Sequence, residues 1–426
     1  MKHWARRFFT IWSAQALSLF GSELVQFALI WWLTSTTGSA TVLATATLIG
    51  LLPQIIIGPF AGALVDRWDR RKTMIVADGL IALSTLALAL INAGGNLQPW
   101  HVYLLMFVRS TGGGFHWPAM SSSTTLMVPE EQLSRVAGMN QTLQGLCAIA
   151  MPPLGALLLS LMPMGSILLI DVGTALVAIA PLLFLSVPQP QRADDQPVSV
   201  LLVLSDMREG LRYLRGMPAI LTVMAMSLLV NICLTPAFSL TPLLITQHHG
   251  GGAMQVAWLD TAAGLGMLSG GLALSAWGGF RQKIKTMLLG LVGLGVGCVV
   301  IALAPSSVLP VSLIGAAIIG IALPIVDGPY IAMLQSITDP GVQGRVFSLA
   351  GSLGKLTTPL GLAVVGPLAD RTGIPPIFGI AAVVTLALAC VALAIPTIRN
   401  LEENRVPLDR NVSPTDSQPA TATSAD

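Results

Sequence analysis

The sequence has little charge, since Asp, Glu, Lys and Arg make up only 10% of its 426 residues. A soluble globular domain carries about 25% charged residues, so the composition excludes an ordinary water-soluble protein. Apolar residues account for 54% of the chain, and the mean hydropathy is +0.77. We therefore expect a membrane protein.

Several kinds of functional site are also missing. The four cysteines all fall in apolar stretches and none has CxxC spacing, which argues against a disulfide framework or a zinc site. The stretch GSLGKLTTP around Lys355 lacks the spacing of a phosphate-binding loop. No Ser/His/Asp constellation or metal-ligand cluster is visible. We expect no enzyme, no metal and no cofactor, and a net charge of +2 gives no indication of a nucleic-acid partner.

Long apolar stretches recur along the chain, each close to the roughly 20 residues that a helix needs to cross a bilayer. They predict an all-α membrane protein with twelve transmembrane helices. The expected segments are 8–33, 41–65, 73–92, 101–122, 136–161, 166–187, 219–245, 255–277, 286–304, 308–333, 345–369 and 375–396.

The distribution of lysine and arginine predicts the orientation of these helices. With the N-terminus in the cytoplasm, 19 of the 22 Lys and Arg residues fall in cytoplasmic parts of the chain. Only Arg371 lies on the other side, whereas Arg109 and Lys355 lie within helices. Positive charge concentrates on the inner side of multi-pass proteins. We therefore expect a protein of the cell inner membrane with both termini in the cytoplasm.

The chain repeats itself. RRKTMIVADGLIALSTLALAL around Lys72 is echoed by KIKTMLLGLVGLGVGCVVIAL around Lys285, and LSRVAGMNQTL around Arg135 by QGRVFSLAGSL around Arg345. The repeats predict two parallel halves of six helices each, an architecture known among transporters. The expected organisation is an N-terminal bundle (1–187), a cytoplasmic linker with an amphipathic helix (188–218), a C-terminal bundle (219–398) and a disordered cytoplasmic tail (399–426).

Charged residues inside apolar helices are costly and are functional by default. Glu23 and Arg109 both fall near mid-depth of their segments. One hypothesis is that Glu23 gains and loses a proton as a central cavity alternates between the two sides of the membrane, under the influence of Arg109. The alternative is a static pair that holds the first and fourth helices together. His116 lies two turns from Arg109 and either relays protons or caps the cavity.

Polar stripes predict which helices line such a cavity. The first segment carries Gln15, Ser22 and Gln26, and the seventh carries Asn231 and Thr235 at four-residue spacing. A second candidate pair, for substrate, coupling or structure, is Asp327 with Lys355. Asp78 and Asp171 are expected near helix ends in structural roles, whereas the role of Asp260 stays open.

One cytoplasmic loop carries a recognisable motif. GALVDRWDRRK, residues 62–72, resembles the loop 2-3 signature of the major facilitator superfamily, and its surroundings resemble the macrolide-efflux type of drug:proton antiporters. The resemblance implies a cytoplasmic gate in which Asp66 faces the start of the eleventh helix near Arg345. The second half has Gly279 at the position equivalent to Asp66, which would leave this latch one-sided. The gate residues that we expect are Gly62, Asp66, Arg67, Arg70, Arg71, Arg135 and Arg345.

Two further motifs are similar to those of the same family. LMFVRSTGG around Arg109 is similar to the helix-4 motif, whose arginine is linked to proton transfer. AMPPLG is similar to the helix-5 motif of antiporters, in which the helix bends. By this resemblance Pro152, Pro153 and Gly155 form the helix-5 bend.

These features together predict a monomeric secondary transporter that works by alternating access. It would export an apolar or amphipathic small molecule, of drug or macrolide type, in exchange for protons. The alternatives are export of an endogenous metabolite such as a siderophore, flipping of a lysophospholipid, and, more distantly, a membrane sensor that does not transport.

Overall fold

The computed structural model describes residues 2–189, 208, 211–338 and 343–395. All regular structure in these ranges is helical, and twelve helices have 20 residues or more. They are α1 (Lys2–Thr37), α2 (Ala40–Arg67), α3 (Arg70–Ala93), α4 (Pro99–Met127), α5 (Glu130–Leu161), α6 (Met164–Phe184), α8 (Pro218–Ser239), α10 (Ala253–Trp277), α11 (Lys283–Ala302), α12 (Leu309–Ile337), α13 (Gln343–Thr372) and α14 (Pro375–Ala394).

The predicted membrane fold is confirmed. Ten of these helices are long and apolar enough to cross a membrane, and α4 and α10 are the two others of similar length. A short α9 (Thr241–Leu243) and a π-helical turn η1 (Leu244–His248) continue α8. The expected amphipathic linker helix and the expected tail lie largely or wholly outside the described residues.

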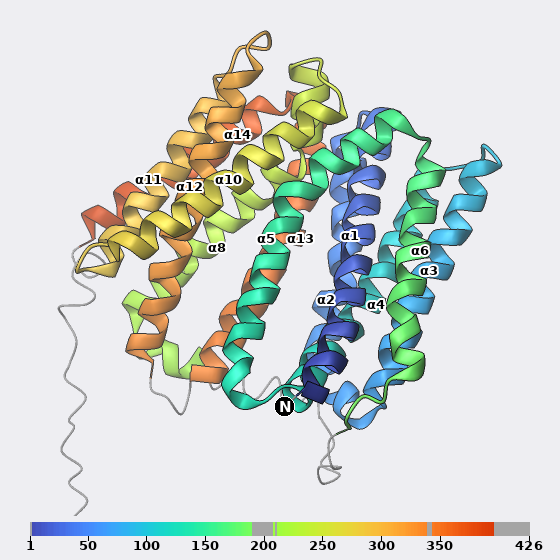
Figure 1. Cartoon of the computed structure of the whole chain (residues 1–426). Coiled ribbons are helices and arrows are strands. Elements are labelled where there is room, and N and C mark those ends of the chain that lie inside the picture. The colour runs from blue at the N-terminus through green and yellow to red at the C-terminus, as the bar shows by residue number, and fades with distance from the viewer. Residues whose placement is uncertain (1, 190–207, 209–210, 339–342, 396–426) are drawn as a thin grey trace, which may run out of the picture.

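The helices form two groups, α1 to α6 and α8 to α14, which lie side by side in Figure 1. Within the first group α3 and α1 pack against α6, and α2 against α4; within the second α12 packs against α10 and α11, and α8 against α13. The groups meet where α13 packs against α2 and where α10 packs against α5. We call the end of the bundle at which α1 begins the near side, and the opposite end the far side.

Small residues allow the helices of the second group to approach closely. A Cβ atom on Gly320 of α12 would lie 2.1 Å from the carbonyl oxygen of Ala263, and one on Gly270 of α10 would lie 2.2 Å from that of Ile321. Any side chain at either position would therefore collide with backbone. Close approach at small residues is the usual way in which helices pack in lipid, where apolar surface alone gives little drive to associate.

Hydrogen bonds join the two groups on the far side. The Asp370 carboxylate, near the end of α13, accepts bonds from the first residues of α2, and the Gln247 side-chain amide donates to the carbonyl of Gly38 at 2.5 Å. Gly366 of α13 approaches so closely that a Cβ there would lie 2.9 Å from the Cβ of Ala44. The far side is therefore closed where α2 meets α13.

Candidate functional site

A cavity of about 640 Å³ lies between the two groups of helices. Most of its wall comes from α1, α2, α3 and α4, and the rest from the end of α8, α9 and α10. The wall combines aromatic rings with polar side chains. The aromatic residues are Phe27, Trp31, Trp117 and Phe238. The charged or strongly polar residues are Gln15, Ser22, Glu23, Gln26, Gln54, Asp78, Arg109, His116 and Asp260.

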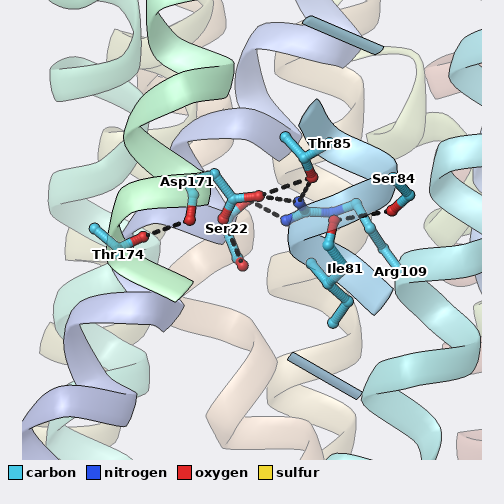
Figure 2. Close-up of polar contacts among 7 residues, drawn as sticks. All are labelled: Ser22, Ile81, Ser84, Thr85, Arg109, Asp171 and Thr174. Atoms are coloured by element: carbon cyan, nitrogen blue, oxygen red, sulfur yellow. Dashed lines mark hydrogen bonds and ion pairs between the residues drawn. The ribbon is translucent and has the colours of Figure 1, made fainter. Parts of the chain in front are cut away.

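Arg109 is held by a closed polar network beside this cavity (Figure 2). Its guanidinium forms an ion pair with Asp171 of α6, which is fully buried, and donates to the carbonyl of Ser22 at 3.0 Å. The Thr85 hydroxyl accepts from Arg109 at 3.2 Å and donates to Asp171 at 3.1 Å. The Ser22 hydroxyl donates to the other Asp171 oxygen at 3.1 Å. Four helices, α1, α3, α4 and α6, thus meet at one buried ion pair.

This network corrects two expectations. Arg109 pairs with Asp171, and no ion pair between Glu23 and Arg109 is found among the described residues, so the static pair of α1 with α4 is not formed. Asp171 is not near a helix end, because α6 begins at Met164 and ends at Phe184. A carboxylate buried at mid-helix needs a cation, and Arg109 meets that need.

Glu23 itself lies on the wall of the cavity. Its side chain forms no hydrogen bond or ion pair in the part of the chain that the structure describes, although Arg109 is near enough to act on it electrostatically. Glu23 is therefore a carboxylate at the cavity wall whose oxygens face no fixed partner.

A second polar cluster lies on the near side of Arg109, one to two turns along α4. The His116 Nε2 atom is 3.4 Å from an oxygen of Asp78, and the Gln15 side-chain amide donates to the other Asp78 oxygen at 3.0 Å. Asp78 is buried eight residues into α3, not near its end as expected. All three side chains border the cavity, which places His116 beside an acidic group.

The second group of helices contributes different residues from those expected. Asn231, Thr235, Asp327 and Lys355 are not among the residues that line this cavity. Asn231 and Thr235 bond within their own helix instead, Asn231 to the carbonyl of Ser227 and Thr235 to Asn231. Asp327 and Lys355 are exposed side chains, and no ion pair between them is found among the described residues. Asp260 of α10 is the acidic residue of this group that borders the cavity.

The prolines of α5 have a definite structural consequence. Proline lacks an N–H group, so Pro153 leaves the carbonyl oxygen of Ile149, four residues earlier, without its helical partner. The Thr261 hydroxyl of α10 donates to that oxygen at 3.4 Å. The helix continues through Pro152 and Pro153 to Leu161, and a Cβ at Gly155 would lie 2.8 Å from the ring of Phe27. The motif thus joins α5 to α10 and to α1.

Two of the expected gate arginines bind within their own group. Arg70 is buried and donates to the carbonyl of Ser122 at 2.7 Å, in the last two turns of α4. Arg71 donates to the carbonyls of Leu182 and Leu183, in the last turn of α6. Cations at helix C-termini are stabilised by the helix dipole. Arg70 and Arg71 therefore fasten the near-side ends of α4 and α6.

The remaining gate residues are less informative. The side chains of Gly62, Asp66 and Arg345 are not among those described, and Arg67 and Arg135 are exposed. Asp69 caps the start of α3, because its carboxylate accepts from the backbone N–H of Lys72 at 3.0 Å. The contact between Asp66 and the eleventh helix stays a prediction.

Comparison with known proteins agrees with this geometry. A family model described as Major Facilitator Superfamily matches residues 11–358 and, in a second match, 235–422. The chain is 34% identical over 404 residues to macrolide efflux protein A of Streptococcus pyogenes, covering 94% of this chain and 98% of that protein. It is 27% identical over 389 residues to the multidrug efflux pump Tap of Mycolicibacterium fortuitum, covering 90% and 94% of the two chains.

Solved structures resemble the fold. The nucleoside transporter NupG superposes with a TM-score of 0.72 at 11% identity, over 91% of this chain and 99% of that one. A bacterial homologue of the human lysosomal transporter Spinster superposes with a TM-score of 0.64 at 15% identity, over 92% and 96%.

Proposed function

We propose that this chain, which belongs to the Major Facilitator Superfamily, exports an apolar or amphipathic compound of drug or macrolide type in exchange for protons. The chain is a multi-pass membrane transporter with a small-molecule substrate, and not an enzyme. The observation that carries the proposal is the cavity between the two helix groups, whose wall combines aromatic rings with the unpaired carboxylate of Glu23. The names of relatives, a macrolide efflux protein and a multidrug efflux pump, favour drug export over other cargo.

In this proposal Glu23 carries the proton. A carboxylate at a wall between aromatic rings and polar groups can be neutral when the cavity is dry and charged when it is wet. Arg109 does not pair with Glu23 but is held near it by Asp171, so a cation stays close to the carboxylate that would exchange the proton. His116 and Asp78 lie toward the near side, where they border the path by which a proton would leave.

The contacts on the far side support a transporter that works by alternating access. The far side is closed by Asp370 and Gln247, so we propose that these contacts open when the near side closes. On the near side Asp66, with Arg345, would form the matching contact. The two bundles 1–187 and 219–398 would move about the linker 188–218 as rigid units. We place the protein in the inner membrane as a monomer, with the near side in the cytoplasm.

Drug accumulation in cells tests the export function. Cells that lack their own drug exporters and express the full chain should accumulate less of a radiolabelled macrolide than cells with an empty vector. A protonophore should remove the difference, because export draws on the proton gradient. Cells with Glu23→Gln should accumulate as much macrolide as cells with the empty vector. Glu130→Gln removes an exposed carboxylate at the start of α5, and cells with this variant should accumulate as little macrolide as cells with the wild type.

Equal accumulation with and without the wild-type chain, across macrolides and lipophilic dyes, would contradict drug export. Export of a siderophore or flipping of a lysophospholipid would then take its place. Protein levels in the membrane fraction must match in all variants, since a lost signal from a misfolded variant would carry no information on Glu23.

A further inference from the structure

The charges on the cavity wall do not cancel. Arg109 is paired with Asp171, which lies behind the wall, and His116 lies against Asp78. Of the acidic residues in the lining, Glu23 and Asp260 take part in neither of these contacts. No lysine contributes to the lining, and Arg109 is the one arginine in it, among the residues that the structure describes. The space that receives cargo is therefore acidic.

Glu23 and Asp260 differ in their surroundings. Glu23 lies on α1 within the electrostatic reach of Arg109, so part of its charge is offset. Asp260 lies on α10, and within the described chain it has neither a hydrogen bond nor a charged neighbour acting on it. Asp260 is partly exposed at the cavity wall. A carboxylate held there without a partner favours a cation from outside the chain.

The position of Asp260 is fixed by packing. The next residue, Thr261, is bonded to the carbonyl of Ile149 that Pro153 leaves free. One turn further, a Cβ at Gly264 would lie 2.8 Å from the side chain of Ile149, so α10 and α5 are in close contact there. Asp260 therefore sits at the junction of the two helix groups, where a cargo molecule would touch both.

The remaining wall suits a lipophilic cation. The rings of Phe27, Trp31, Trp117 and Phe238 border the same cavity. Ring faces attract ammonium-type cations, and the attraction grows when the site excludes water. An acidic group together with several rings is thus a site for an organic cation with bulky apolar substituents, more than for a neutral molecule of the same shape.

We propose that Asp260 binds the cationic group of the transported molecule, and that the cargo is a lipophilic organic cation. The inference rests on the proposed export function, and it assigns a different role to each of the two carboxylates. Asp260, on the second helix group, holds the positive charge of the cargo. Glu23, on the first group, exchanges the proton. The cation and the proton then occupy different acidic residues of one cavity.

Two probes of similar bulk separate charge from shape. Tetraphenylphosphonium is a permanent cation, and triphenylphosphine oxide is a neutral compound with three of the same rings. Their dissociation constants are measured by titration calorimetry on the purified full chain in lipid nanodiscs. The wild type should bind the cation more tightly than the neutral compound. Asp260→Asn should raise the dissociation constant of the cation by about tenfold or more, and should change that of the neutral compound by no more than about twofold.

Asp327→Asn is the matched control, because it removes a carboxylate of the same helix group that does not border the cavity. It should leave both constants unchanged. An unchanged affinity of Asp260→Asn for tetraphenylphosphonium, or a wild type that binds both probes equally, would overturn the inference. Thermal unfolding of each variant shows that it is folded, so that a loss of binding by Asp260→Asn can be assigned to the missing charge.

The outcomes also separate this inference from the export function. If the wild type lowers macrolide accumulation in cells but Asp260→Asn binds the cation as the wild type does, drug export is supported and the proposed role of Asp260 is contradicted. If the wild type neither exports nor binds either probe, the proposed function itself fails, and the role of Asp260 with it.

Discussion

Arg109→Gln is expected to lose transport and to destabilise the folded protein by about 3 to 5 kcal/mol, the usual cost of removing one partner of a buried ion pair. The cost arises because Asp171 is fully buried and would keep its charge without a counterion. The Ser22 and Thr85 hydroxyls would remain, but they donate only two hydrogen bonds to that carboxylate. Thermal unfolding in detergent and macrolide accumulation in cells measure the two effects.

A double-mutant cycle separates stability from function. Asp171→Asn alone should also destabilise, because Arg109 would then lack its anion. The double variant Arg109→Gln with Asp171→Asn removes both charges and should regain much of the stability. It should still lack proton-coupled export, because the positive field near Glu23 is gone. Arg6→Gln, at an exposed position near the start of α1, should change neither property. An Arg109→Gln variant with wild-type unfolding would contradict the account of this network.

Asp370→Asn is expected to shift the protein toward the state in which the far side is open. The Asp370 carboxylate accepts hydrogen bonds from the backbone N–H groups of Ala40 and Thr41 at 2.6 and 3.0 Å, and from the hydroxyls of Ser39 and Thr41. It thus binds the positive end of α2 from the other helix group. Loss of the charge should cost about 1 to 2 kcal/mol in the closed state, which changes the ratio of the two states about 5- to 30-fold.

Spin labels on the far side measure this shift. Cysteines at Asn96, between α3 and α4, and at Ser307, between α11 and α12, are exposed positions on opposite helix groups. In a background without the native cysteines, Asp370→Asn should raise the fraction of long distances between the two labels. Arg371→Gln removes a neighbouring exposed charge and should leave the fraction of long distances unchanged. A distance distribution unchanged by Asp370→Asn would show that this contact does not control the far side.

The sequence around Asp370 repeats the near-side motif. GALVDR at 62–67 and GPLADR at 366–371 share the glycine, leucine, aspartate and arginine, at the C-terminal ends of α2 and α13. These two helices pack against each other across the groups. Judged from Gly279 alone, the second half lacks a counterpart of Asp66. A similar sequence instead ends α13, three helices after α10, at the far side, where Gly366 lets α13 approach α2.

Much of the fold could be predicted from hydropathy, because each helix must be apolar for about 20 residues to cross a bilayer. The importance of Arg109 was also predictable, since charges are rare in such helices. Its partner was not. Which residue faces which depends on the rotation of each helix and on its neighbours, and hydropathy reports neither. The pairing of Arg109 with Asp171 was therefore missed. The regular spacing of Asn231 and Thr235 suggested that these two residues line the cavity, whereas α8 contributes only Phe238 and Ser239, at its end, to the wall.

The most direct test of drug and proton exchange at Glu23 is proton movement in energised inverted membrane vesicles. Adding a macrolide or a cationic dye should release stored protons from vesicles with the wild-type chain, because cargo entry is exchanged for protons. Glu23→Gln, present in the membrane at the same level, should release none, whereas Glu130→Gln should behave like the wild type. The account would be contradicted by wild-type vesicles that release no protons for any compound of a chemically broad panel, or by equal release from Glu23→Gln.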